Sequence, residues 1–313
     1  MAVALLSGLL LQAAIGIAQF GVQHHLGLSV LGELPIDLAY PGVSVISAGG
    51  PPLIRLYGLS GHPNVIGGYA AIVLLLSVGL LRERRKLWWA LWLIGLIGLL
   101  LTFSRSAALG LLIGLAVISL LRRPNRRRAI GLIVSGGSVL GIFALLFAPF
   151  LIARLSTDVA TEQVSIDERV EQTTLAWQLF RERPLTGVGA GNFTAYNPPN
   201  ALTQVMRVHN VPLLIASELG LPGLALWLLS VGAVIVAGVR SSRATTEIWP
   251  VLMTSALIAI LVISLFDYYW WTSSQGVYGW ATICGALLAQ TVTRSTRNGV
   301  PSIGAVSNSR AAK

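Results

Sequence analysis

Long apolar stretches are the feature that most constrains how this 313-residue chain can fold. Hydrophobic residues make up 54% of the chain and charged residues only 11%, whereas soluble domains contain about 25% charged residues. This composition excludes an ordinary water-soluble globule, so we expect an all-α polytopic membrane protein. Eight stretches have the length and apolar character of transmembrane helices. They are residues 2–20, 64–81, 87–103, 106–121, 129–150, 211–239, 248–266 and 275–292.

The distribution of basic residues predicts the orientation of these spans. Alternate connections hold 15 of the 22 Lys and Arg residues, and cytoplasmic loops of membrane proteins collect Lys and Arg. We therefore place these basic connections in the cytoplasm and both long polar connections, residues 21–63 and 151–210, on the outer face. The same rule accounts for the net charge of +10 without a nucleic-acid partner. The basic connections are residues 82–86, 122–128, 240–247 and the tail after residue 292.

The two ends of the chain differ from the middle. The N-terminus is apolar from Ala2 and has no Lys or Arg before Arg55, so it lacks the basic region of a signal peptide. We expect a chain that is shortened at its N-terminus. Residues 293–313 are rich in Ser, Arg, Asn and Gly and are predicted to form a disordered cytoplasmic tail. The remaining residues, 1–292, are predicted to form one transmembrane domain.

Arg105 stands between two apolar stretches, in Thr102-Phe-Ser-Arg105-Ser. Two interpretations remain open from the residues alone. The side chain can lie along the membrane surface as an interfacial arginine, or it can hold an anionic head group, because a guanidinium matches phosphate oxygens with two parallel hydrogen bonds.

The connection 151–210 contains a predicted amphipathic helix near the membrane surface. Ser165-Ile-Asp-Glu168 has the spacing of a capping box, and Pro184 ends the helical pattern. Arg169 would then lie in the first turn, where the helix dipole disfavours a cation. Its partner is predicted to be either neighbouring carboxylates or a phosphate. The apolar positions of this pattern are Val170, Thr174, Trp177 and Phe180.

Glycines recur after Pro184, at Gly187, Gly189 and Gly191. Glycines at this spacing can bind phosphate through their backbone amides. The pattern does not match a P-loop, and nucleotides are scarce on the outer face. We therefore favour a tight-turn role.

His209, Asn210 and Glu218 are the remaining candidates for chemistry. His209 lies at the predicted outer mouth of the helices and is either a general base or a residue bonded at a helix start. Glu218 lies inside an apolar stretch, where a carboxylate is costly and marks a functional position. At nine residues from His209 we expect it to brace another element, for example through an arginine. The four histidines and four aspartates have no recognised metal-ligand spacing, and we predict no cofactor.

Taken together, these segments resemble the O-antigen ligase family and the related O-antigen polymerases over about residues 10–240. The chain has eight predicted spans where the family has about a dozen. The matching segments are Gly61-His-Pro-Asn64, Thr102-Phe-Ser-Arg105-Ser, Glu168-Arg169 through Trp177, Pro184 through Phe193, and His209-Asn210 through Glu218.

The resemblance implies a glycosyltransferase of the GT-C type in the bacterial inner membrane, with its active site on the periplasmic face. Its donor would be an undecaprenyl-pyrophosphate-linked glycan and its acceptor a glycan or lipid A–core, without a metal. By resemblance, Arg105 and Arg169 bind the pyrophosphate and His209 activates the acceptor hydroxyl, supported by Asn64, Asn210 and Glu218. An O-antigen or exopolysaccharide polymerase is the main alternative, and a transporter of lipid-linked glycans is a further one.

Overall fold

The computed structural model describes residues 1–40, 42–48, 50–83, 85–121, 141, 144–145, 147–155, 160–196 and 207–299. Within these residues the chain is helical apart from loops and one antiparallel pair of short strands, β1 (Val45–Ile46) and β2 (Leu53–Ile54). The long helices are α1 (Ala2–Val22), α2 (Pro63–Ser77), α3 (Lys86–Leu101), α4 (Arg105–Leu121), α7 (Ala160–Glu182), α9 (Val211–Arg243), α10 (Trp249–Ser264) and α12 (Ser274–Gly299). The short ones are η1 (Ser29–Leu31), η2 (Leu80–Glu83), α6 (Ala148–Leu155), α8 (Phe193–Tyr196) and α11 (Tyr269–Thr272).

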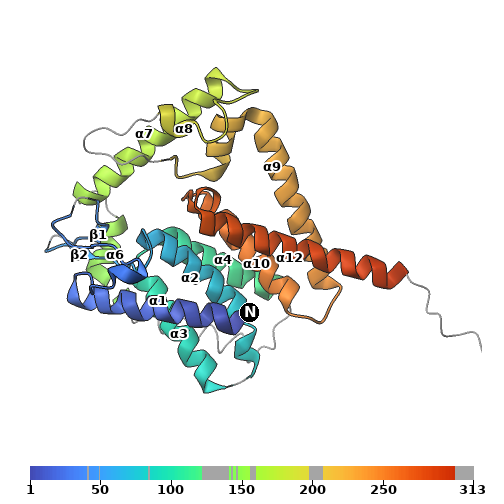
Figure 1. Cartoon of the computed structure of the whole chain (residues 1–313), viewed down its shortest axis with the longest axis horizontal. Coiled ribbons are helices and arrows are strands. Elements are labelled where there is room, and N and C mark those ends of the chain that lie inside the picture. The colour runs from blue at the N-terminus through green and yellow to red at the C-terminus, as the bar shows by residue number, and fades with distance from the viewer. Residues whose placement is uncertain are drawn as a thin grey trace, which may run out of the picture.

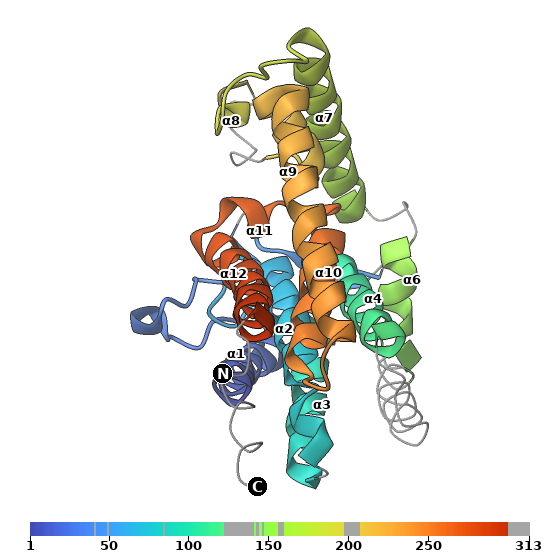
Figure 2. The same ribbon diagram turned by 90° about the vertical axis from the view of Figure 1, so that its right-hand side faces the viewer.

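The helices form a packed body and an outer segment. Helices α1, α2, α3, α4, α10 and α12 lie side by side in the body (Figure 1). Helices α7 and α8 lie away from it, against the first turns of α9. Figure 2 shows α9 running from this outer segment down beside α10, so it connects the two parts of the molecule.

Helices α2 and α10 form the centre of the body. Both are apolar on all sides, and both are buried along most of their length. A helix that is hydrophobic all round must be surrounded by other helices or by lipid. Here α4 packs against both of them, and α1 and α3 cover α2. The largest hydrophobic core therefore lies between α2, α4 and α10, with Leu75, Leu252 and Ile263 almost fully buried in it.

The structure confirms the all-helical prediction but does not confirm eight spans. Seven of the eight predicted stretches coincide with described helices. Among the described residues, only α1 and α9 are both long and apolar enough to cross a bilayer. Helices α2, α3, α4 and α10 are apolar but shorter. For example, the 15 residues of α2 reach about 22 Å, against a hydrocarbon core of about 30 Å.

Two further predictions concern the least described parts of the chain. The predicted stretch 129–150 lies mostly outside the described residues, and α6 begins only at Ala148. The tail was predicted to be disordered from residue 293, but α12 continues to Gly299. No proline lies between Ser274, where α12 begins, and Pro301, so the backbone can continue its helical hydrogen bonds. Residues 300–313 lie outside the described part.

The helix predicted in the connection 151–210 exists, but its start was predicted wrongly. Helix α7 begins at Ala160, so Ser165-Ile-Asp-Glu168 lies inside the helix and is not its cap. Arg169 is therefore in the third turn, where the dipole of the helix start has faded. The predicted end before Pro184 is confirmed, because α7 stops at Glu182.

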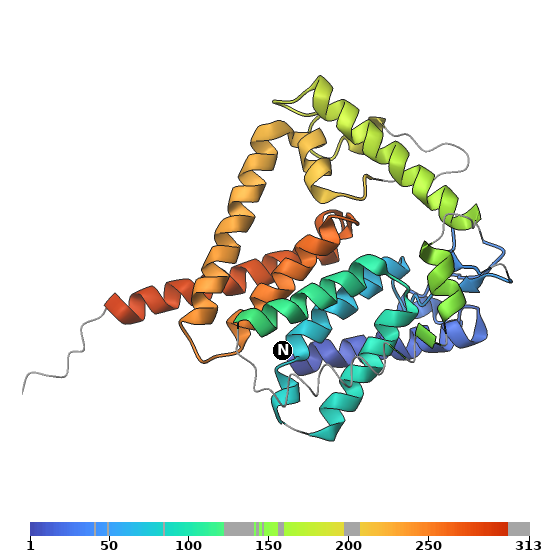
Figure 3. The same cartoon turned by 180° about the vertical axis from the view of Figure 1, so that it is seen from behind.

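The predicted apolar positions of α7 are not the ones that pack against α8 and α9. Val170 and Trp177 are exposed, whereas Gln172, Ala176 and Leu179 are buried against α8 and α9. These three residues recur at spacings of three and four, as residues on one face of a helix do. Seen from behind in Figure 3, α7 extends from the start of α9 toward α6. Helix α7 therefore packs into the outer segment through the face that carries Gln172, Ala176 and Leu179.

Helix α9 is bent close to its start. Gly220 has φ 68° and ψ −171° inside the helix, and Pro222 follows two residues later. Glycine tolerates the positive φ, and proline lacks the backbone amide that would continue the hydrogen bonds of the helix. The bend separates a short first part, which belongs to the outer segment, from the long part beside α10.

Candidate functional site

His209 lies at the junction of the outer segment and the body. The next residue, Asn210, caps α9: its Oδ1 accepts a hydrogen bond from the Leu213 amide at 2.9 Å. The Asn210 Nδ2 donates to the carbonyl of Leu265, just after α10, at 3.2 Å. On the other side, Val208 is fully buried. The backbone at His209 is therefore held by both α9 and the end of α10.

Gln172 of α7 fixes the orientation of the His209 ring. The His209 Nδ1 lies 2.9 Å from the Gln172 Oε1. An amide oxygen can only accept, so Nδ1 carries the proton and donates it. The neutral ring then has its lone pair on Nε2, which is the form that can take a proton from a hydroxyl. Tyr268 packs edge-on against the same ring, with centroids 5.0 Å apart.

Burial and a neighbouring cation keep this ring neutral. Burial lowers the pKa of His209 from 6.5 to about 3, and the positive charge of Arg169 lowers it further in the same direction. Arg169 and Gln172 are three residues apart on α7, so both lie on the face that meets His209. The structure thus brings together two of the predicted site residues, Arg169 and His209.

A buried chain of polar side chains extends from this point into the body. Asp267, in the turn between α10 and α11, accepts a hydrogen bond from the Asn64 Nδ2 at 2.9 Å. The Asn64 Oδ1 in turn accepts from the Arg55 Nη2 at 2.7 Å. All three side chains are at least nine-tenths buried. Asn64 was predicted as a supporting residue. Its hydrogen bond to Asp267 connects it to the candidate site.

Asp267 has an unusual electrostatic setting. Burial raises the pKa of its carboxyl group to about 6, while the charge of Arg169, the Asn64 hydrogen bond and the charge of Arg55 oppose this rise. The carboxyl group therefore lies within the field of Arg169. The charge of Arg169 thus acts on both Asp267 and His209.

Arg105 lies in a different position. It is the first residue of α4 and is exposed. The turn before it is tight, since Phe103 has φ 51°. In this turn the Thr102 carbonyl accepts a hydrogen bond from the Arg55 Nε at 2.6 Å. Arg105 thus lies three residues after Thr102, whose carbonyl contacts the buried polar residues through Arg55. It is not among the charges that set the pKa of His209 or Asp267.

Two small residues allow the turn before Arg105 and the turn after Asp267 to approach α2. A Cβ added at Gly67 would lie 2.8 Å from the Thr102 Oγ1, and one at Gly68 would overlap the Tyr269 hydroxyl. Glycine permits such close backbone approach. These contacts place both turns beside Asn64 at the start of α2.

Glu218 braces the glycine-rich loop. Its Oε2 accepts from the Gly191 amide at 2.9 Å, and its Oε1 accepts from the Phe193 amide at 3.2 Å. The expected partner was an arginine, but the carboxylate is satisfied by backbone amides. The same bonds occupy the amides that a phosphate would need. The tight-turn interpretation is supported by the positive φ of Gly187, Gly189 and Gly191.

The sequence analysis did not identify Gln172, Asp267 and Arg55 as site residues. Gln172 could have been found by its spacing of three from Arg169. Asp267 follows an apolar stretch directly, as intramembrane carboxylates with a function often do. Arg55 carried a weaker signal, since it was only the first basic residue of the chain.

Within the described residues, no group of three or more His, Cys, Asp or Glu side chains is placed to hold a metal ion. The charged and titratable groups brought together at the site include one neutral imidazole, the guanidinium groups of Arg169 and Arg55, and one carboxyl group. This set can bind an anion and accept a proton from a neighbouring hydroxyl.

Two comparisons with known proteins bear on this arrangement. No curated protein matches the chain. A family model described as O-antigen ligase matches residues 89–228, which include Arg105, Arg169, Gln172, His209 and Glu218. This family is integral to the membrane, in agreement with the two long apolar helices. Over residues 89–228, the chain is therefore similar to the O-antigen ligase family.

Proposed function

We propose that this protein is a ligase that moves a glycan from an undecaprenyl-pyrophosphate carrier to an acceptor hydroxyl, with lipid A–core as the acceptor. The reaction takes place on the periplasmic face of the bacterial inner membrane and needs no metal. The observation that carries the proposal is the hydrogen bond from His209 Nδ1 to Gln172 Oε1. It leaves Nε2 as a proton acceptor beside a cation, Arg169.

The reaction begins when the acceptor hydroxyl gives its proton to the His209 Nε2. The oxygen then forms a bond to the anomeric carbon of the donor sugar, and the bond from that carbon to the pyrophosphate oxygen breaks. The products are the glycosylated acceptor and undecaprenyl pyrophosphate. Arg169 and Arg105 stabilise the negative charge that develops on the leaving group, a contribution of several kcal/mol in a water-poor site.

Arg169 also couples donor binding to proton transfer. The charge of Arg169 lowers the pKa of His209. A pyrophosphate bound at Arg169 supplies negative charge, which favours the protonated imidazole. The base therefore becomes stronger when the donor is in place, and the acceptor is activated only in its presence.

The decisive experiment measures glycan transfer and donor binding in parallel, with purified protein in liposomes. His209→Ala should lose about 10²- to 10⁴-fold in transfer rate while it still binds donor, because both arginines remain. His24→Ala is the matched control and should keep its activity, since His24 forms an exposed ion pair with Asp37.

Each result has a distinct meaning. Wild-type transfer by His209→Ala would refute the base assignment, and a joint loss of binding and transfer would place His209 in the donor site. Transfer without ATP or an ion gradient is expected of an enzyme, whereas dependence on either would favour a transporter. Loss of transfer on chelation would refute metal independence. Transfer to a second lipid-linked glycan in place of lipid A–core would indicate a polymerase.

A further inference from the structure

The segment that follows α1 has an apolar tip, which we define as residues 26–34. Val30 is 96% exposed and Leu31 is 60% exposed, and both belong to η1. Leu26 and Leu34 are exposed beside them. In Figure 2 this blue segment stands out from the side of the helical body, beyond α1 and α12. The tip is thus an apolar surface that no described element covers.

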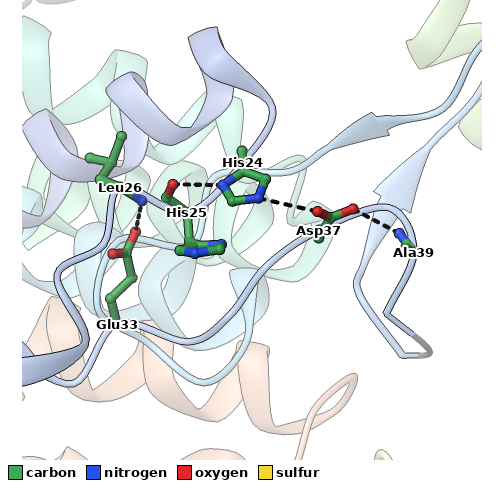
Figure 4. A network of polar contacts seen from close by, with 6 residues as sticks. All are labelled: His24, His25, Leu26, Glu33, Asp37 and Ala39. Atoms are coloured by element: carbon green, nitrogen blue, oxygen red, sulfur yellow. Dashed lines mark hydrogen bonds and ion pairs between the residues drawn. The ribbon is translucent and has the colours of Figure 1, made fainter.

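A buried carboxylate braces the tip from inside. The Glu33 Oε1 accepts hydrogen bonds at 2.7 Å from the Leu26 amide and from the Gln19 Nε2 of α1. The Glu33 Oε2 accepts from the Leu28 amide, and the side chain is only 6% exposed. Figure 4 shows the Glu33 carboxylate turned inward toward Leu26. The only charged residue of the tip therefore contributes no charge to its surface.

The base of the segment is closed by a second polar cluster. The His24 Nε2 lies 3.1 Å from the Asp37 Oδ2, and the other Asp37 oxygen accepts from the Ala39 amide at 2.9 Å (Figure 4). His24 Nδ1 bonds the carbonyl of His25 at 2.8 Å. The side chains of His24 and Asp37 thus make their polar contacts with each other and with nearby backbone groups.

This arrangement reverses the polarity of an ordinary solvent-exposed loop. Polar groups are inside and large apolar side chains are outside, and such exposed apolar patches mark contacts with a partner or a membrane. Glu33 is the only charged residue among residues 26–34 and is buried, so the exposed surface of the tip carries no charged side chain. An uncharged apolar tip matches the boundary between lipid head groups and acyl chains.

The tip is also continuous with a surface that faces lipid. Helix α1 is one of the two helices long and apolar enough to cross a bilayer. Its exposed apolar residues include Leu11 and, at its end, Val22. The exposed residues Leu26 and Val30 extend this surface beyond the helix end. We propose that the apolar tip inserts sideways into the lipid leaflet at the C-terminal end of α1 and anchors the outer region there.

The anchor is connected to the candidate site through α1. Gln19 donates to Glu33 and to the Gly58 carbonyl, and its Oε1 accepts from the Gly58 amide at 2.8 Å. Gly58 lies three residues after Arg55, the buried arginine that binds Asn64. Insertion of the tip would therefore set the height of Arg55 and Asn64 relative to the membrane surface. The inference does not depend on which reaction the site performs.

The test uses an environment-sensitive fluorophore, NBD, on single cysteines in a Cys284→Ser background. Val30→Cys carries the probe on the tip, where 96% exposure makes disruption of packing negligible. Gly50→Cys is the matched control, in the exposed polar turn between β1 and β2. The full-length protein is reconstituted in phospholipid vesicles with and without doxyl-labelled lipid.

Insertion predicts a blue-shifted emission at position 30 that doxyl lipid quenches, and water-like, unquenched emission at position 50. Water-like emission at position 30 would overturn the proposal. A blue shift at position 30 without quenching by lipid, together with disulfide cross-linking between two Val30→Cys chains, would show that a second copy covers the tip and would also overturn it.

Discussion

At the scale of single residues, the pH dependence of the reaction should follow Asp267 and not His209. Burial raises the Asp267 pKa to about 6 and lowers the His209 pKa to about 3. As the pH falls through 6, Asp267 takes up a proton and its negative charge no longer offsets the positive charge of Arg169. The unopposed cation disfavours protonation of the neutral His209 ring, which makes His209 a weaker base toward the acceptor hydroxyl. We therefore expect kcat/KM to fall near pH 6 and the Asp267→Asn variant to lose this acidic limb.

The pH profiles of the two proteins distinguish the assignments. An acidic limb near pH 6 that persists in Asp267→Asn would assign the titration to His209, in agreement with the ordinary imidazole pKa of 6.5. A wild-type profile that is flat to pH 5 would contradict the charge assigned to Asp267. Glu171→Gln, on the exposed face of α7, is a control that should leave the profile unchanged.

Gln172 is a positioning residue, and its removal should affect turnover more than binding. Gln172→Leu keeps the approximate volume but leaves the His209 Nδ1 without its acceptor. The ring can then turn or change tautomer, and misplacement of a catalytic group can cost about 10²-fold. We expect kcat to fall by up to this factor with little change in the KM for donor.

The conservative variant Gln172→Glu separates positioning from packing. A carboxylate at this position still accepts from Nδ1, and its charge raises the pKa of His209. We expect it to recover most of the turnover lost in Gln172→Leu and to bring the titration of His209 upward from about pH 3, as a second acidic limb beside that of Asp267. Equal losses in both variants, with an unchanged pH profile, would mean that Gln172 only fills space.

Residue types were easier to predict from the sequence than their contacts. Arg169 and His209 were identified because a charged residue and an imidazole are conspicuous beside apolar stretches. Gln172 and Asp267 were missed because their roles depend on which helices meet. The bond between Gln172 and His209 joins residues 37 positions apart, and that between Asn64 and Asp267 joins residues 203 positions apart. Local patterns contain no information on such pairings.

At the scale of elements, the bend in α9 depends on Glu218 and the glycine-rich loop. The Gly189 amide donates to the Glu218 carbonyl at 2.8 Å, and the Leu221 amide donates to the Pro184 carbonyl at 2.7 Å. The Glu218 carboxylate adds the bonds to Gly191 and Phe193. The loop and the first part of α9 therefore form one unit that supports His209.

Loss of the Glu218 carboxylate should loosen this unit. Glu218→Gln keeps the shape but replaces one acceptor oxygen by a donor, which leaves one loop amide without a partner. A buried amide in this state costs about 1–3 kcal/mol. We expect a lower unfolding temperature in detergent than for the wild type. Glu171→Gln, which changes an exposed carboxylate on α7, should unfold like the wild type, and an unchanged midpoint in Glu218→Gln would refute the bracing role.

Helix positions were predictable because apolar stretches and prolines mark them directly, as at the end of α7 before Pro184. The start of α7 was not, since Ser165 and Glu168 have capping-box spacing but lie inside a helix that continues backward to Ala160. The residues through which α7 packs against α8 and α9 were not predicted either. Val170 and Trp177 are apolar but exposed, and near a membrane an apolar face can meet lipid instead of protein.

At the scale of the whole molecule, α9 is the element that relates the site to the membrane. Its long part, residues 221–243, is about 34 Å long at 1.5 Å per residue, which is enough to cross a hydrocarbon core of about 30 Å. It starts beside the outer segment and ends with Arg240 and Arg243. Basic residues at this end favour the cytoplasmic side, so we expect His209 on the opposite face.

Cysteine labelling on either side of α9 tests this orientation. Single cysteines at Ala195 in α8 and at Ala244 after α9, both exposed, are introduced in a Cys284→Ser background. With intact cells permeable only at the outer membrane, an impermeant maleimide should label position 195 at once and position 244 only after the inner membrane is opened. Equal labelling of both positions from outside would show that α9 does not cross the membrane. Labelling of position 244 alone would invert the topology, and the site would then face the cytoplasm and not the periplasm, where the proposed reaction takes place.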